Sequence, residues 1–239
     1  IGVEQLVNAS DTDVLEVFAR LNSYTVALNH QELRHAKYQG EFKWSVHEAA
    51  RRWEVLWERY KVVTMRDRLR MQDDQLMAEM FGLLIRGMAG GEQREIDRLY
   101  SQNDNQFTDS ARVNAQLNEV LNCILGELQP ALDSTLSRSP HFLMLFASVA
   151  HALFGLPSSS TAPATPARDA ALLSDTEAAV QNLRQLADVI VMSEDESRTL
   201  PEDIQRFWFQ SHTTTQSIKS RSVRFPWYVR CLLPQHIPL

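Results

Sequence analysis

The amino-acid sequence predicts a mainly α-helical protein. Glycine is scarce, with 8 residues in 239, whereas dinucleotide-binding domains, β-sandwiches and propellers use more glycine in their tight turns. Apolar residues make up 44% of the chain and recur at helical spacing in most segments, so they can build a sizeable core. The length suits one large domain or two small ones.

The chain is expected to open with a short strand over residues 1–7 and a helix that starts at Ser10. A second short helix is expected to begin at Asn29. Asn29 and Glu32 have the spacing of a capping box, in which each side chain accepts a hydrogen bond from the other residue's backbone. Gly40 is expected to end this helix.

A helical bundle is predicted over residues 44–156. Its expected helices run from Val46 to Tyr60, Asp73 to Met88, Glu92 to Tyr100, Asp109 to Leu136 and Pro140 to Leu156. Pro130 is expected to kink or break the fourth helix because proline lacks a backbone N–H. The fifth is strongly apolar, and we expect it at the centre of the bundle.

The last third of the chain is predicted to add helices that pack on this bundle. Residues 157–170 are rich in proline, serine and small side chains, which indicates an exposed linker or loop. Over residues 171–239 we expect helices from Asp175 to Met192, from Pro201 onward, and from Thr214 to Arg224, with an acidic turn at 194–196.

Charge is distributed unevenly along the chain. The formal net charge is −6, yet residues 41–70 carry a net charge of +3 and residues 212–239 a net charge of +4. Residues 71–119 and 157–211 are each net −5. A nucleic-acid partner would therefore meet a local basic patch and not a basic protein.

Cysteine content and hydropathy indicate the cellular setting. Cys123 and Cys231 are the only cysteines, too few for a disulfide framework or a four-cysteine zinc site. No apolar run reaches the roughly 20 residues that span a bilayer. We therefore expect a cytoplasmic protein that neither spans nor binds a membrane.

Common catalytic signatures are missing from the sequence. It contains no glycine-rich phosphate loop, no G-x-S-x-G and no H-E-x-x-H. The histidines show no metal-ligand spacing, and His151, within an apolar segment, is expected in the core. We predict no catalytic residue and no metal site in this chain.

The most specific segment runs from residue 17 to residue 34 and predicts a helix, a tight polar turn and a second capped helix. Five polar residues crowd around the turn: Arg20, Asn22, Asn29, Glu32 and Arg34. They can serve folding, with Asn29 and Glu32 as caps, Asn22 as a helix stop and Arg34 paired with an acid. They can equally bind a phosphate or a base through arginine and asparagine donors.

The pattern F-x-R-L-N-x-x-x-x-x-L-N-x-x-E-L-R-x-A-x-x-x-G-x-F, from Phe18 to Phe42, resembles the later part of the ParB/sulfiredoxin-like N-terminal domain of GmrSD-type restriction proteins. The resemblance implies that residues 1–43 are a short remnant of an α+β ParB-like domain. It also implies that Arg20, Asn22, Asn29, Glu32 and Arg34 touch nucleotide or pack the two helices onto that domain.

The resemblance further implies nucleotide binding and hydrolysis in the service of defence against foreign or modified DNA. That family often carries an HNH-type nuclease domain, and its nucleotide motif, of the type D-G-Q-Q-R, lies upstream of the matching segment. Nothing in residues 1–11 matches that motif. We therefore expect this chain to hold no cofactor itself, with a nucleoside triphosphate and Mg²⁺ belonging to a longer parent protein.

A second candidate site lies near the C-terminus. Lys219, Arg221 and Arg224, with serine and threonine hydroxyls between them, can meet DNA phosphates. The alternative is a solvated helix face whose cations pair with the acidic stretch 194–196.

Two functions are consistent with the sequence. The first is a fragment of a GmrSD-like DNA-defence protein, whose helical region supports a nucleotide-binding ParB-like domain and contacts DNA or a partner subunit such as a nuclease. The alternative is a non-catalytic, all-helical protein-interaction module. Either allows an oligomer.

Overall fold

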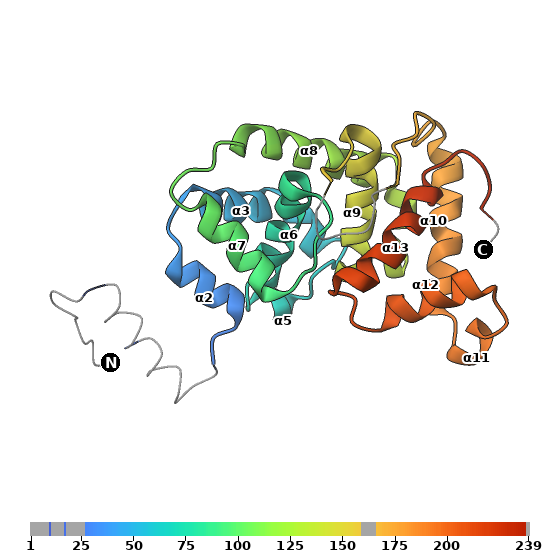
Figure 1. Cartoon of the computed structure of the whole chain (residues 1–239), viewed down its shortest axis with the longest axis horizontal. Coiled ribbons are helices and arrows are strands. Elements are labelled where there is room, and N and C mark those ends of the chain that lie inside the picture. Colours follow the sequence, from blue (N-terminus) through green and yellow to red (C-terminus); the bar gives the residue numbers. More distant parts are fainter. Residues whose placement is uncertain (1–9, 11–16, 18–26, 159–165, 238–239) are drawn as a thin grey trace.

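The computed structural model describes Ser10, Val17, residues 27–158 and residues 166–237. Over these ranges the chain forms twelve α-helices, two single 3-10 turns and no strand (Figure 1). The α-helices are α2 His30–Lys37, α3 Glu41–Arg52, α4 Val55–Glu58, α5 Met65–Arg68, α6 Gln72–Arg86, α7 Gln93–Asn103, α8 Ser110–Gly126, α9 Ser139–Phe154, α10 Thr176–Val191, α11 Glu194–Ser197, α12 Glu202–His212 and α13 Ile218–Cys231. The 3-10 turns are η1 Gln129–Ala131 and η2 Thr135–Ser137.

The mainly α-helical class is confirmed, but the α+β remnant predicted for residues 1–43 is not seen. Where this region is described, over residues 27–43, the chain forms α2 and the start of α3. The predicted strand over residues 1–7 and the helix predicted from Ser10 fall almost entirely outside the described residues.

Helix α9 is the centre of the molecule, as its apolar sequence predicts. Twelve consecutive residues, from His141 to Ala152, are buried. The helix packs against α6 and α8 on one side and against α13 on the other. In Figure 1 it stands between the group α2–α8 and the group α10–α13.

The helix predicted from Val46 to Tyr60 is instead two helices, and two tryptophans explain the break. Trp53 leaves the helical conformation and donates its indole N–H to Asn118 on α8, at 3.0 Å. The indole of Trp57 donates to the carbonyl of Ala50 at 2.8 Å. A continuous helix would use that carbonyl for the backbone N–H of residue 54, which bonds to Arg51 at 3.3 Å instead.

Pro130 breaks the helix predicted from Asp109 to Leu136, and α8 ends at Gly126. A proline clashes with the carbonyl four residues before it and offers no N–H to that carbonyl. The chain continues through η1 and η2 before it enters α9.

Gly40 does not end α2, contrary to the prediction. The helix stops at Lys37, and Gly40 is the N-cap of α3. A Cβ at Gly40 would lie 1.6 Å from the carbonyl oxygen of Asp104, so the glycine is required by close packing against the end of α7. Similarly, α6 ends at Arg86 and not at Met88, and its C-cap Gly87 has a φ of +76°, which favours glycine.

The C-terminal helices differ from the predicted ones mainly at their ends. The expected acidic turn is the short helix α11, and α12 begins directly after Pro201. Helix α13 continues past Arg224 to Cys231, with Pro226 inside it. None of the described helices is long and apolar enough to cross a membrane.

Part of the predicted loop 157–170 is fastened to α9. The Arg168 guanidinium donates to the carbonyls of Ala152 at 2.9 Å and Leu153 at 2.8 Å. These acceptors lie in the last turn of α9, where carbonyls lack partners within the helix. Residues 159–165 lie outside the described part of the chain.

Candidate functional site

The start of α2 confirms the predicted capping box. The Asn29 side-chain oxygen accepts hydrogen bonds from the backbone N–H groups of Gln31 and Glu32, each at 2.9 Å. The Glu32 carboxylate in turn accepts from the Asn29 N–H at 2.7 Å. Two of the motif residues therefore have a defined local role.

Arg70 fastens this cap to the segment that leads into α6. Its guanidinium donates to both carboxylate oxygens of Glu32, at 2.7 and 2.9 Å, and to the carbonyl of Ala27 at 2.8 Å. Its own carbonyl accepts from the Asn29 amide at 2.7 Å. Burial raises the pKa of Glu32, but the hydrogen bonds from Arg70 and Asn29 outweigh it and hold the pKa below its ordinary value.

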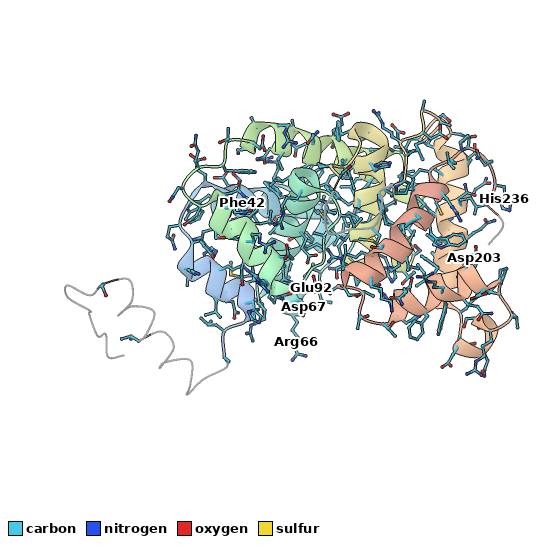
Figure 2. The ribbon with its side chains drawn as sticks, viewed as in Figure 1. Phe42, Arg66, Asp67, Glu92, Asp203 and His236 are labelled. Atoms are coloured by element: carbon cyan, nitrogen blue, oxygen red, sulfur yellow. The ribbon has the colours of Figure 1, made fainter. Side chains whose placement is uncertain are left out.

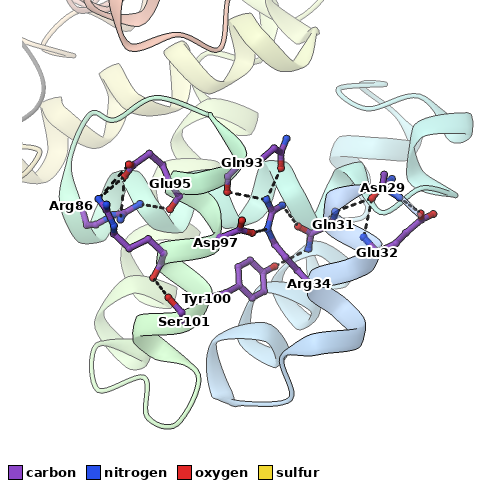
Figure 3. Close-up of polar contacts among 11 residues, drawn as sticks. Asn29, Gln31, Glu32, Arg34, Arg86, Gln93, Glu95, Asp97, Tyr100 and Ser101 are labelled. Atoms are coloured by element: carbon purple, nitrogen blue, oxygen red, sulfur yellow. Dashed lines mark hydrogen bonds and ion pairs between the residues drawn. The ribbon is translucent and has the colours of Figure 1, made fainter. Parts of the chain in front are cut away.

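Arg34 sits in a buried polar network between α2 and α7 (Figure 3). Its Nε donates to Asp97 at 2.7 Å, and its terminal nitrogens donate to the backbone carbonyl of Gln93 and to the side chain of Gln31, each at 3.1 Å. The Gln31 amide donates to the Tyr100 hydroxyl at 2.8 Å, and burial raises the pKa of that phenol. Arg34 thus has the acid partner that the folding interpretation expects.

The described motif residues are therefore occupied by contacts within the protein. Asn29, Glu32 and Arg34 join α2 to the start of α6 and to α7. Arg20 and Asn22 lie outside the described residues. A contact of these five residues with nucleotide stays a prediction.

The C-terminal candidate divides into one exposed and two buried cations. Lys219 lies on the surface, whereas Arg221 is 4% exposed and Arg224 is fully buried. Because both guanidiniums are buried, neither is exposed to a DNA duplex in the structure, and the DNA contact of these three residues stays a prediction. The burial of Arg221 and Arg224 could not be predicted from the sequence, because most of their partners lie far away along the chain.

Arg221 and Arg224 each bridge distant helices. Arg221 forms a buried ion pair with Glu79 of α6 and donates to the carbonyl of Ala89 at 3.0 Å. Arg224 donates to the carbonyl of Pro140 at 2.7 Å. The alternative pairing with residues 194–196 does not form either, since Glu194 and Asp195 pair with Arg198.

His141 and Tyr228 complete the surroundings of Arg224. The His141 Nδ1 lies 3.2 Å from the Arg224 guanidinium and 3.0 Å from the Tyr228 hydroxyl. Because the guanidinium can only donate, Nδ1 is the acceptor of that contact and the ring proton lies on Nε2. Burial, followed by the charges of Arg224, His212 and Arg138, lowers the pKa of His141 to about 3. The imidazole is therefore neutral at pH 7.

A cavity of about 650 Å³ lies beside these residues. It brings together the segment before α6, the beginning of α9 and the beginning of α13, and so unites the two basic stretches of the sequence. The lining includes Lys61, Thr64, Asp67, Gln72, Gln75, Glu79, Ser137, Arg138, Ser139, Thr215, Gln216 and Arg221. Figure 2 shows Asp67 and Arg66 at the edge of the molecule near α5, with Arg66 extending outward.

Two further histidines have a defined setting, one in the core and one beside a buried acid. His151 is in the core, as predicted. His47 lies 3.1 Å from the buried carboxylate of Asp74. Across the described ranges, no three histidine, cysteine or acidic side chains gather as they would around a metal ion.

Comparison with known proteins finds no family model, no curated protein and no solved structure that matches this chain.

Proposed function

We propose that this chain is the helical part of a GmrSD-like DNA-defence protein, in which it supports an upstream ParB-like nucleotide domain and contacts DNA or a partner subunit. The proposal rests on the position of the polar motif in the fold. Asn29, Glu32 and Arg34 fasten α2 to the bundle at the point where the chain enters it.

This placement suits a mechanical connection between two domains. Arg70 holds Ala27 and Glu32 together, and Arg34 locks the next turn of α2 onto α7. A ParB-like domain whose C-terminal part is residues 1–43 would then be coupled to the other helices through α2. Nucleotide-driven movement of that domain would reach the bundle through α2.

The nucleotide part is tested in a longer protein that includes an upstream D-G-Q-Q-R-type motif. We expect it to hydrolyse a nucleoside triphosphate with Mg²⁺, and we expect Arg34→Ala to uncouple DNA stimulation of hydrolysis more than basal hydrolysis. Exposed Arg94→Ala is the matched control. If the longer protein hydrolyses no nucleotide, the proposed parent activity fails.

The DNA part is tested on the chain as it stands. Fluorescence anisotropy with a duplex of about 20 base pairs, at about 50 and 200 mM salt, should show weak binding that decreases with salt. Lys219→Ala should lower the slope of log affinity against log salt by about 1, whereas Lys37→Ala on α2 should not. Binding that is absent at low salt would remove DNA as a direct partner.

A protein-interaction module is the second candidate, and exposed apolar side chains favour it. Met65, the first residue of α5, and Leu69, its C-cap, are 64% and 77% exposed, and Phe209 on α12 is 54% exposed. Isolated exposed apolar residues are common, so the test is concentration-dependent assembly. Light scattering that shows self-association lost in Met65→Ser/Leu69→Ser, without loss of DNA binding, would favour this candidate.

A further inference from the structure

The cavity between the start of α6, the N-terminus of α9 and the start of α13 is bordered by an excess of positive charge. Lys61 and Arg138 are exposed cations on its lining, and Asp67 is the exposed acid there. Asp67 already accepts a hydrogen bond from the Thr64 hydroxyl at 2.7 Å. The remaining charged pair on the lining, Glu79 and Arg221, neutralises itself.

Helix α9 directs its positive end at the same cavity. Ser137, Arg138, Ser139 and Pro140 line it, and α9 begins with no side-chain cap on its first turn. At sixteen residues, α9 is long enough to present a substantial positive partial charge at that end. Pro140 has no N–H and the N–H groups of His141 and Phe142 donate to the Arg138 carbonyl, so the first turn offers the N–H of Ser139. Helix N-termini of this kind bind phosphate in many proteins.

Arg224 adds a buried cation without a counter-ion directly behind the lining. It is fully buried, and its described partners are the carbonyls of Thr215 and Pro140, the neutral ring of His141 and the hydroxyl of Tyr228. Thr215 and Pro140 both line the cavity. The Nε atoms of Arg221 and Arg224 are also buried without a partner among the described residues. A buried charge with no counter-ion is costly, and a bound anion nearby would reduce that cost.

The other lining groups are suited to phosphate oxygens. The Ser139 hydroxyl and the amides of Gln72 and Gln216 can donate hydrogen bonds, whereas the hydroxyls of Thr64 and Ser137 already donate to Asp67 and to the Ser134 carbonyl. A volume of about 650 Å³ lies within the range of about 300–1,000 Å³ typical of small-molecule sites. Because Arg224, which has no counter-ion, lies behind the lining of a concave site, a compact ligand fits better than a duplex that would touch only the rim.

We propose that this cavity binds a small molecule through its phosphate groups, with Lys61, Arg138 and the first turn of α9 as the contacts and Arg224 as the buried charge behind them. This assignment does not depend on the DNA-defence proposal, since it uses only groups in the described helices.

The test is calorimetric titration of the full chain with inorganic pyrophosphate and, separately, with ATP. We expect one site per chain for at least one of the two, and at least a tenfold loss of affinity in Lys61→Ala/Arg138→Ala. The matched control is Arg51→Ala/Arg94→Ala, which removes two exposed arginines that do not line the cavity. Both double variants change only surface side chains, so both should keep the wild-type melting temperature without ligand.

Each outcome decides the proposal. Binding that weakens in the rim variant and not in the control supports it, and a preference for ATP over pyrophosphate would identify a nucleotide. The proposal is wrong if neither compound binds, if both variants weaken binding equally, or if binding exceeds one site per chain. It is also wrong if only duplex DNA binds through Lys61 and Arg138, which would assign this face to DNA.

Discussion

Two buried arginines join helices in this protein by different means. Arg34 pairs with Asp97, whose side chain is half exposed, and fills its other donors with glutamine oxygens. Arg224 is fully buried and donates to carbonyls and a neutral histidine, while its Nε has no partner among the described residues. The first arrangement serves packing of α2 on α7. The second leaves a positive charge near the cavity.

Arg34→Ala should lower the free energy of unfolding by about 2–3 kcal/mol, because it leaves acceptors in buried Gln31 and half-buried Gln93 without their donor. Asp97 can turn to solvent, which keeps the loss below that of a fully buried pair. Urea unfolding followed by circular dichroism measures it. Exposed Arg94→Ala should change stability by less than about 0.5 kcal/mol. Equal stability of Arg34→Ala and the wild type would contradict this role.

His141 should make the folded state sensitive to mild acid. Its pKa falls from 6.5 to about 3 on folding, so below pH 6.5 the unfolded state binds a proton that the folded state does not bind. The contribution of neutral His141 to the free energy of unfolding is therefore complete above pH 6.5 and decreases as the pH falls. By pH 5 the loss is about 2 kcal/mol relative to pH 8.

His141→Gln keeps a neutral acceptor for Arg224 and removes the titration. Urea unfolding at pH 8, 6.5 and 5 should therefore show wild-type stability declining faster than that of the variant by about 2 kcal/mol over the range. Parallel declines would show that His141 is not the group responsible.

At the residue scale, a side-chain contact can be predicted from the sequence where the two partners are close in the chain. Asn29 and Glu32 are three residues apart, so their capping box is visible as a spacing. The partner of Arg221 is Glu79, which is 142 residues away, and no local pattern marks that contact. The three cations of the C-terminal segment look alike in sequence, and only tertiary packing separates exposed Lys219 from the other two.

At the scale of single elements, the helices were predictable and several of their ends were not. Apolar spacing identified α6, α9 and α10, since each buries one or more faces. The break at Trp53 depends on an indole that reaches Asn118 on another helix. Gly40 is required by the backbone of α7, which the sequence around it does not reveal.

Gly40→Ala should destabilise the protein by about 3 kcal/mol, because the added methyl group would overlap the carbonyl oxygen of Asp104 and push α3 from the end of α7. Gly126→Ala, at the end of α8, is the matched control. Nothing lies within 4 Å of a Cβ there, so the alanine should be neutral or stabilise by about 0.5 kcal/mol. Thermal unfolding of both variants compares the two sites, and similar melting temperatures would contradict the close approach at Gly40.

At the scale of the whole molecule, α9 is shared by the two groups of helices. It contributes to the core on the side of α6 and α8 and also on the side of α13. The sequence suggested a bundle over 44–156 with later helices packed on it. The contacts of α9 make those later helices part of the same core, because without α13 one apolar side of α9 would face water.

We therefore expect α6 and α13 to unfold together. Native-state hydrogen exchange should give their most protected amides the same free energy of opening, within about 1 kcal/mol. Phe146→Ala, at a fully buried position on α9, should lower both values by an equal amount of about 3–5 kcal/mol, whereas Leu69→Ala, at an exposed position, should lower neither. If Phe146→Ala weakened protection in α13 and left α6 unchanged, the two groups would be separate folding units, and α9 would belong to only one of them.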